Sequence, residues 1–309
     1  MMPSFRLRPT SARSLVACGV FTCLCLALAP SVARAQVSEL VIRTPTGEVE
    51  AEERAKESEQ KRREQTRGAV MLQVGGIRGL ATDVRGGRLS GEATSVVFAI
   101  DQETSSYARL TSGSGISGRG STHAHIGGGS GGFDGQYQGA IAGGPRFGSG
   151  AQALAVRVGL GGLLRGNNRF YQSELSLPVG ELAYQVHVAG ELLLDLGLTG
   201  GWVLVGRHNV DGSTRKLGNS GKVGGFALLA ARHLQVVGSM SRLLTASGPD
   251  VPIDTATVNA CVSPLMGLLF CGFFSEARSA VFLPGSRAEQ ATRTRFLGVS
   301  VGLGGISVD

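Results

Sequence analysis

The sequence predicts an all-β protein, built as an antiparallel up-and-down meander over residues 68–309. Two observations predict this fold class. Apolar residues recur at every second position, which is the period of a strand with one apolar face, and no segment after residue 67 sustains a helical period. The alternation is clearest over residues 96–100, 154–160, 182–188, 192–198 and 297–303.

Residues 1–35 have the parts of a secretory signal peptide in the expected order. Arg6, Arg8 and Arg13 precede an apolar run over residues 15–29, and Ala33-Arg34-Ala35 supplies small residues for cleavage before Gln36. The apolar run is shorter than the roughly 20 residues that a membrane-spanning helix needs. We therefore expect an exported protein.

Residues 36–67 form a second zone, in which acidic and basic residues alternate closely. Glu53 with Lys56 and Glu57 with Lys61 stand at helical spacing, and good helix formers dominate. Apolar residues are too few to form a stripe that packs on a core. The zone is predicted to be a solvated helix or a disordered arm, and the alternative is a docking element for an envelope protein.

The β zone, residues 68–309, divides into strands and connections. Segments 147–160, 168–177, 182–198 and 293–304 reach about the 9–11 residues that a tilted strand needs to cross a bilayer. Val179-Gly180 and Gly200-Gly201 are interpreted as two-residue turns, although a turn at Gly190 would divide the 182–198 segment. A Gly/Ser-rich stretch at 112–132 is predicted to be a long loop or weak strands of small residues. Polar loops are expected at 210–221, 246–254 and 284–292.

Aromatic residues such as Phe147, Tyr171, Trp202 and Phe296 lie near the ends of predicted strands. With export, spanning length and alternation, they make residues 68–309 resemble the bacterial outer-membrane β-barrel class, porin-like proteins whose strands face lipid outward and a polar lumen inward. The resemblance implies a closed transmembrane barrel of about 10–12 strands, with outer-membrane lipid as its partner. A soluble periplasmic or surface-exposed β-protein that binds a partner is the alternative.

Polar residues alternate with the apolar ones on the predicted strands. In a barrel they would face the lumen, because charges are costly on a lipid face. The lumen-facing candidates are Arg157, Gln172, Glu181, Gln185, His187 and Glu191. A turn at Val179-Gly180 would set Gln172 opposite His187. A hydrolase that uses His187 with Ser173 or Ser176 is a weaker hypothesis, since Ser173 falls on the apolar face.

Two cysteines, Cys261 and Cys271, remain after the signal peptide is removed. They flank a predicted turn at 263–267, so they would face each other across a hairpin, either as a disulfide or as two buried thiols. His123 and His125 would project from one side of an extended stretch, but a metal site needs three or four ligands. We therefore predict no metal site there and expect a solvated loop.

Composition and motifs exclude several functions. The formal charge is +7, but residues 1–35 hold four of the 30 basic residues and none of the 23 acidic ones. The rest of the chain carries no basic patch interleaved with aromatic residues, so nucleic-acid binding is excluded. It also has no phosphate-binding loop, nucleophile elbow or Cys-x-x-Cys motif. No catalytic or cofactor site is predicted.

These observations favour a non-enzymatic outer-membrane barrel that acts as a small pore or as a structural anchor of an envelope assembly. Residues 36–67 would be the contact for an envelope partner. A minor alternative, suggested by the class alone, is the barrel component of a gliding-motility or polysaccharide-export machine.

Overall fold

A computed structural model describes residues 66–308, except 87–88, 111–112, 131, 149–150, 169, 189–190, 211–212, 217, 245–252, 266 and 283–288. The predicted signal peptide and nearly all of the charged arm lie outside the described residues. The strands are β1 Thr66–Gly86, β2 Leu89–Arg109, β3 Ser114–Gly129, β4 Gly132–Phe147, β5 Gln152–Asn167, β6 Phe170–Val188, β7 Leu192–Val210, β8 Ser213–Lys216, β9 Ser220–Ala231, β10 Leu234–Leu244, β11 Ile253–Leu265, β12 Leu268–Phe282 and β13 Glu289–Val308. Among the described residues there is no helix long and apolar enough to cross a membrane.

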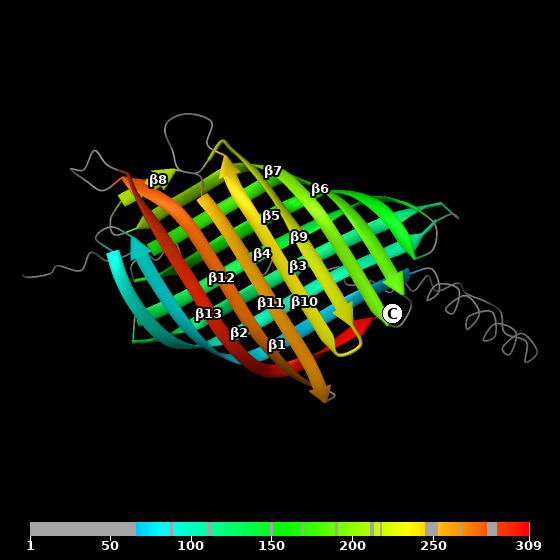
Figure 1. Ribbon diagram of the computed structural model, residues 1–309, viewed down its shortest axis with the longest axis horizontal. Coiled ribbons are helices and arrows are strands. Elements are labelled where there is room, and N and C mark those ends of the chain that lie inside the picture. Colours follow the sequence, from blue (N-terminus) through cyan, green and yellow to red (C-terminus); the bar gives the residue numbers. More distant parts are fainter. Residues whose placement is uncertain are drawn as a thin grey trace, which may run out of the picture. The chain divides into compact units, whose positions relative to one another are not determined.

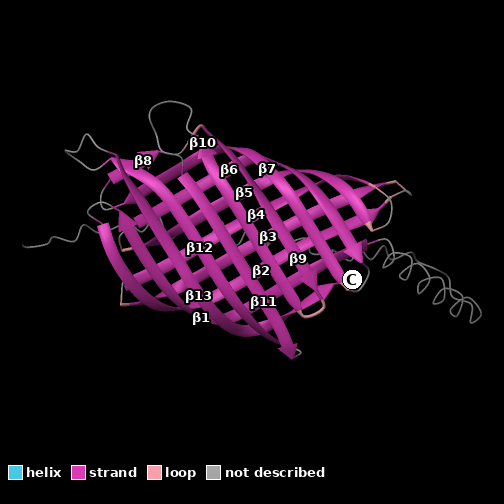
Figure 2. Cartoon of the chain, viewed as in Figure 1, coloured by secondary structure: helices cyan, strands magenta, loops and turns pink. Residues whose placement is uncertain are grey.

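Twelve of these strands form one closed antiparallel sheet (Figures 1 and 2). Each strand from β1 to β7 and from β9 to β13 pairs with the next, β7 pairs with β9, and β1 pairs with β13 to close the ring. β8 pairs only with residues 207–210 of β7, beyond the part of β7 that β9 covers. The predicted meander barrel of about 10–12 strands is confirmed.

The two ends of the barrel differ in their connections. β1 begins and β13 ends at what we call the terminal end, where every connection has two to four residues. The connection that contains β8 and the segments 245–252 and 283–288 all lie at the opposite end, the loop end. These unequal connections match those of outer-membrane barrels, in which short turns face the periplasm and longer loops face the outside.

Side chains alternate between two environments along the strands. All twelve barrel strands carry exposed large apolar residues, such as Leu198 at 69% and Leu303 at 71% exposed. The intervening side chains are buried and largely polar, including Arg157, Gln172 and Asp195, each 0% exposed. An apolar exterior around a polar interior inverts the arrangement of a soluble protein and is that of a lipid-facing barrel.

Two predicted turns are wrong. Val179-Gly180 lies inside β6 and Gly200-Gly201 inside β7, and the two strands pair straight through them, Val179 with Gly201 and Gly180 with Gly200. The chain turns at 189–191 instead, which divides the 182–198 segment. Position 201 needs glycine for space, because a Cβ there would lie 2.9 Å from the Pro178 carbonyl oxygen. Glycine at this point permits close approach of strands and does not mark a reversal.

The long-loop interpretation of residues 112–132 is also wrong, and the alternative of strands of small residues is correct. β3 pairs along its length with β2 and β4. Its glycines let the neighbouring backbones approach, since a Cβ on Gly127 would lie 2.3 Å from the Val96 carbonyl oxygen. Backbone pairing therefore builds a strand that apolar periodicity does not reveal. The polar segment 210–221 likewise contains β8 and the start of β9.

Candidate functional site: the barrel interior

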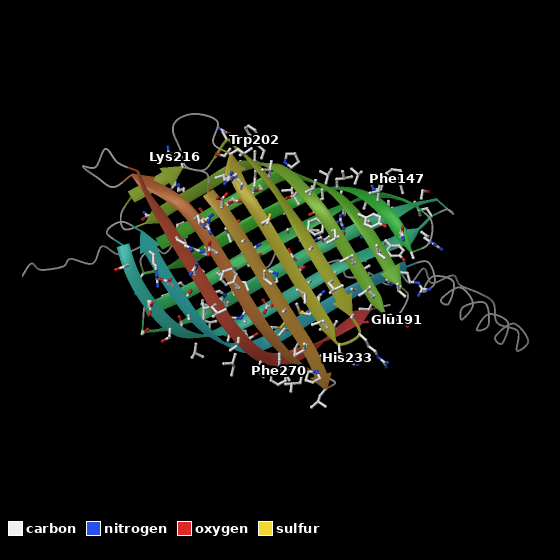
Figure 3. All side chains as sticks on the ribbon, in the orientation of Figure 1. Phe147, Glu191, Trp202, Lys216, His233 and Phe270 are labelled. Carbon is white, nitrogen blue, oxygen red and sulfur yellow. A yellow bond between two sulfur atoms is a disulfide. The ribbon has the colours of Figure 1, made fainter. Side chains whose placement is uncertain are left out.

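Inward side chains meet across the barrel (Figure 3 shows the side chains on the strands). Ser105 of β2 donates to Asp195 of β7 at 2.8 Å, and Arg165 of β5 reaches Ser275 of β12 at 3.5 Å. In the ring of twelve strands β5 and β12 stand opposite each other. These contacts therefore span the whole interior, which makes the interior the candidate site.

An apolar layer fills the interior at the terminal end. It consists of inward residues near the starts of β1, β7 and β10 and near the end of β9. The members are Ala69, Leu193, Leu228, Ala230 and Val237, all 0–7% exposed, with Val308 packed against them. Because β1 and β7 lie on opposite sides of the ring, this layer reaches from one wall of the barrel to the other.

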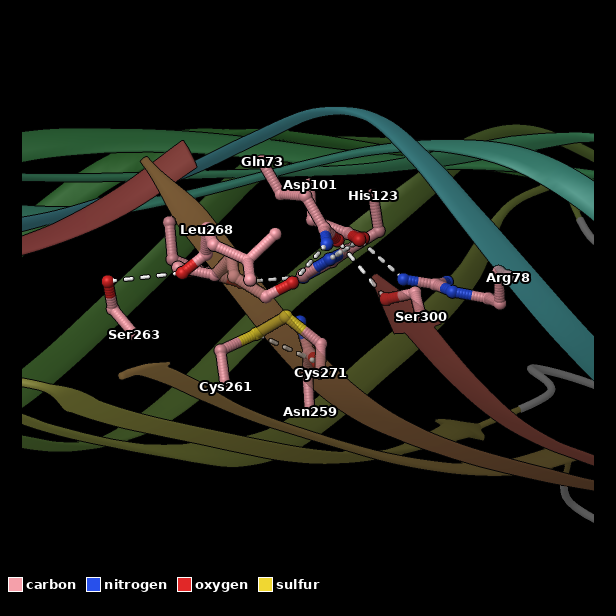
Figure 4. Close-up of a disulfide and its surroundings, with 12 residues drawn as sticks. Gln73, Arg78, Asp101, His123, Asn259, Cys261, Ser263, Leu268, Cys271 and Ser300 are labelled. Atoms are coloured by element: carbon pink, nitrogen blue, oxygen red, sulfur yellow. Dashed lines mark hydrogen bonds and ion pairs between the residues drawn. A yellow bond between two sulfur atoms is a disulfide. The ribbon is translucent and has the colours of Figure 1, made fainter. Parts of the chain in front are cut away.

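A disulfide lies beside the next apolar cluster (Figure 4). Cys261 of β11 and Cys271 of β12 are directly paired in the sheet and their sulfur atoms are bonded. They pack with Met71 and Leu269, and Ile306 lies against the cluster. Of the two alternatives for these cysteines, the structure has the disulfide.

The middle of the barrel holds an ion pair between Arg157 of β5 and Asp195 of β7. Arg157 donates from Nη1 to Oδ2 at 2.8 Å and from Nη2 to Oδ1 at 3.1 Å. Asp195 Oδ2 also accepts from the Ser105 hydroxyl and, at 3.2 Å, from Gln185 Nε2. The carboxylate is thus fully engaged, as a buried charge must be.

This network extends along both sides of the pair. Glu181 of β6 lies 3.0 Å from Arg157 Nε and accepts from Arg119 of β3 at 2.8 Å. The Arg119 guanidinium stacks 3.9 Å from the centroid of the Phe226 ring, which is a favourable cation–π geometry. Six strands, β2, β3, β5, β6, β7 and β9, therefore contribute to one charged network around Arg157.

Towards the terminal end the network continues through Arg146 and its neutral partners. Arg146 of β4 donates from Nε to Gln185 Oε1 at 3.2 Å and stacks on the Tyr107 ring at 3.9 Å. The Tyr107 hydroxyl is 2.8 Å from His187 Nδ1. His187 is thus held by a tyrosine of β2 across the interior.

A second charged cluster lies on β1, β2 and β3 (Figure 4). Asp101 pairs with Arg78, and His123 bridges Asp101 at 3.0 Å and Glu103 at 2.6 Å. The expected solvated position for His123 and His125 is wrong, since both are at most 8% exposed on the inward face of β3. Among the described residues, no three His, Cys, Asp or Glu side chains are placed to hold a metal ion.

A small cavity of about 140 Å³ opens between these clusters and the loop end. The ion pair between Lys222 and Glu174 forms part of its wall. Arg119, Glu181 and Phe226 of the central network also line it. Hydroxyl groups from β10 and β11 contribute two bonded pairs to the wall, each 2.6 Å apart. The pairs are Ser239 with Thr257 and Ser241 with Thr255. The cavity is thus suited to water or a small hydroxylated solute.

The predicted lumen residues separate into three groups. Arg157, Glu181, Gln185 and His187 belong to the central network described above, and each is 0–5% exposed. Gln172 lies apart from them, accepting two hydrogen bonds from Arg165 at 2.9 and 3.1 Å. Glu191 departs from the prediction: it is exposed in the turn before β7, because the chain reverses there and leaves no strand to point it inward.

The hydrolase arrangement does not form. Gln172 pairs with His208 and His187 with Leu193, so the true register separates Gln172 from His187 along β6. Ser176 donates to Glu174 at 3.2 Å, towards the loop end, whereas His187 lies near the terminal end. With the predicted turn gone, the residues of that hypothesis are not brought together.

Sequence reasoning missed the partners of its own candidates. Asp195, Arg119 and Arg146 are buried polar residues that complete the network, and Asp101 with Glu103 forms the second cluster. Alternation was an available signal for Asp195, which lies between Leu194 and Leu196 as Arg157 lies between Val156 and Val158. It was no signal for Arg119, between two glycines, or for Glu103, between Gln102 and Thr104. Which of them meet depends on the closure of the ring.

The strand register and the two faces confirm a porin-like barrel fold. No protein-family model and no curated protein matches the sequence. Among solved structures, the CymD monoaromatic hydrocarbon channel is similar over 79% of this chain and 89% of its own, at 7% identity and a TM-score of 0.34. The NanC porin is similar over 75% and 99% (10% identity, TM-score 0.34), and the KdgM porin over 73% and 97% (10%, 0.29). Likenesses this weak carry no argument about solute or mechanism.

Proposed function

We propose that this protein is a non-enzymatic outer-membrane pore for small polar solutes, closed in the conformation described. The observation that carries the proposal is the charged interior, where Arg157, Glu181 and Asp195 are at most 5% exposed. Buried ion pairs are often no more stabilising than apolar residues of similar volume. Ionisable residues inside membrane proteins usually line a path for ions or polar solutes. A barrel that serves only as an anchor has no need of them.

Two barriers would control the path. The charged network closes the middle of the barrel, and the apolar layer around Leu193 and Leu228, both 0% exposed, closes the terminal end. A solute passes only if both give way, so the wild-type pore is expected to open rarely. The cavity beside Lys222 would be a polar site on the loop-end side of the charged network.

Conductance of the full chain in planar lipid bilayers tests the proposal. The network variant combines Arg157→Ala with Asp195→Ala, the layer variant combines Leu193→Ala with Leu228→Ala, and a fourfold variant joins them. Each double variant should raise the frequency of opening, and the fourfold variant should conduct steadily. The matched control is Leu196→Ala with Leu198→Ala, two outward leucines of β7 that are 39% and 69% exposed.

The control should behave as the wild type does. If it opens as readily as the layer variant, loss of leucine volume weakens the barrel in general and the barrier assignment is wrong. If neither the wild type nor the fourfold variant conducts, the pore is rejected.

The apolar layer favours a second candidate, a structural anchor of an envelope assembly. A barrel sealed at the terminal end suits an anchor as well as a closed pore. Residues 36–67, the last two of which begin β1, would then bind the envelope partner. Deleting 36–65, which leaves β1 intact, should abolish partner capture without changing conductance if the protein is both a pore and an anchor. The soluble partner-binding alternative requires purification without detergent, which the apolar exterior opposes.

A further inference from the structure

A charged rim interrupts the apolar exterior at the loop end. On β13, outward Leu297 is followed towards that end by Arg295 and Arg293, and on β12 their paired positions are Glu276 and Arg278. On the neighbouring strands the outward residues also change from apolar to charged towards the loop end. Their outward charged residues are Asp83 and Arg85 on β1, Arg242 on β10 and Asp254 on β11. We call these eight residues the charged rim.

Three arginines of the rim stand in register on adjacent strands. Arg278 of β12 pairs directly with Arg293 of β13, which pairs directly with Arg85 of β1. Side chains in such positions have Cβ atoms about 4.5–5.5 Å apart, and like charges there destabilise a sheet. The three side chains are 60%, 40% and 68% exposed. Repulsion among the three guanidinium groups therefore destabilises the sheet. An anion that bridges them would relieve this repulsion.

The acids of the rim neutralise it only in part. Glu276 accepts from Arg278 Nε at 2.7 Å, from Arg295 Nε at 2.9 Å and from Arg293. One carboxylate thus serves three guanidinium groups. Arg242 is different, because Asp254 matches it with two hydrogen bonds of 2.7 and 3.1 Å. Arg85 is paired too, because it donates from Nε to Asp83 at 3.1 Å and lies 3.8 Å from Glu92. The surplus positive charge of the row therefore lies on Arg278 and Arg293, which share Glu276 with Arg295.

An outward groove of about 490 Å³ lies beside the row. Val223, Met240 and Ala256 supply its apolar lining. Arg242 and Arg278 border it together with the carboxylates of Asp254 and Glu276, and the hydroxyls of Ser241 and Thr255 also line it. Further from the loop end, the outward residues of β13 from Leu297 to Leu303 are apolar and face lipid. Apolar lining next to surplus arginine fits an amphiphile that has an anionic head.

We propose that the charged rim binds the phosphate-bearing headgroup of a membrane lipid in the leaflet at the loop end. Arg85, Arg278 and Arg293 would hold the phosphate oxygens, for which the planar guanidinium is well shaped, and an acyl chain would lie in the groove. This site is on the exterior and does not depend on whether the barrel conducts.

Native mass spectrometry of the full chain in detergent tests the site. The probes are dioleoyl phosphatidic acid, dioleoylglycerol, which lacks the phosphate, and inorganic phosphate. The wild type should retain phosphatidic acid and not dioleoylglycerol. The triple variant Arg85→Gln, Arg278→Gln and Arg293→Gln should bind phosphatidic acid about 100-fold more weakly, at about fivefold for each arginine.

The matched control is Arg109→Gln with Arg232→Gln, two exposed arginines at the terminal end, and it should bind as the wild type does. Heat-dependent gel mobility checks that each variant is folded, and Arg85→Gln alone, with a fivefold loss, replaces a triple variant that fails to fold. The proposal is overturned if the arginine variants keep wild-type affinity or if dioleoylglycerol binds equally well. Displacement of phosphatidic acid by an equal concentration of inorganic phosphate would also overturn it, in favour of a free-anion site.

Discussion

Arg157 and Asp195 form a two-point ion pair in the middle of the barrel, and neither side chain is exposed. The arginine comes from β5 and the aspartate from β7, the two strands on either side of β6. From β6, Gln185 donates a hydrogen bond to Asp195, and Glu181 forms an ion pair with Arg157. The pair joins strands that the sheet itself does not connect directly. It is therefore both the centre of the interior network and its most sensitive point.

Removing one partner of the Arg157–Asp195 pair should lower the free energy of unfolding far more than removing a charge on the exterior. Asp195→Ala leaves Arg157 with Glu181 as its remaining ion-pair partner and should lower the free energy of unfolding by about 3 kcal/mol. Glu92→Ala removes a carboxylate that is 81% exposed and should change it by no more than about 0.5 kcal/mol. Urea titration in lipid vesicles measures both. Equal losses would mean that the central pair does not hold the interior together.

The lipid-facing exterior predicts a depth-dependent cost for charge. Val299 is 70% exposed in the middle of the apolar run of β13. Val299→Arg should destabilise the barrel by about 2–4 kcal/mol, whereas Ser307→Arg, near the terminal end of the same strand, should cost about 0–1 kcal/mol. The same vesicle titration compares them. In a soluble protein, both exposed positions would accept arginine equally.

The disulfide predicts protected thiols in the exported protein. Cys261 and Cys271 are 1% and 5% exposed and bonded to each other, so a maleimide reagent should label neither in unfolded, unreduced protein and both after reduction. Replacing both by serine should lower the free energy of unfolding by about 2–3 kcal/mol, since the bond closes a short loop. Labelling without reduction would show that the pair is not bonded.

The glycines of β3 predict a steric contrast. Gly127→Ala places a Cβ 2.3 Å from the Val96 carbonyl oxygen, whereas Gly79→Ala meets no atom within 4 Å. The first substitution should reduce the yield of protein with heat-dependent mobility, and the second should leave it unchanged. Comparable yields would contradict the close pairing of β2 with β3.

Much of the barrel could be predicted from the sequence because alternation is a local property. Leu154 and Val156 point outward and Arg157 points inward because successive side chains of a strand face opposite sides of the sheet. Gly200 and Gly201 misled the prediction, because glycine serves both turns and close strand contacts. β3 was obscured because its glycines and serines leave no apolar period to detect.

The interior contacts were beyond sequence reasoning for a different reason. Asp195 meets Ser105 although 90 residues separate them, and only the closed ring brings β2 to β7. Arg278, Arg293 and Arg85 likewise become neighbours through strand register and closure between β13 and β1. Inward or outward position is local information, whereas pairing across the ring is not.

The most direct test of the central claim, a closed barrel in the outer membrane, is gel mobility before and after boiling. The full chain would be extracted in mild detergent from an isolated outer-membrane fraction. The account predicts recovery in that fraction and a change in mobility on boiling, because a closed sheet resists unfolding in cold detergent. Recovery in the soluble fraction, with one mobility in both samples, would contradict it.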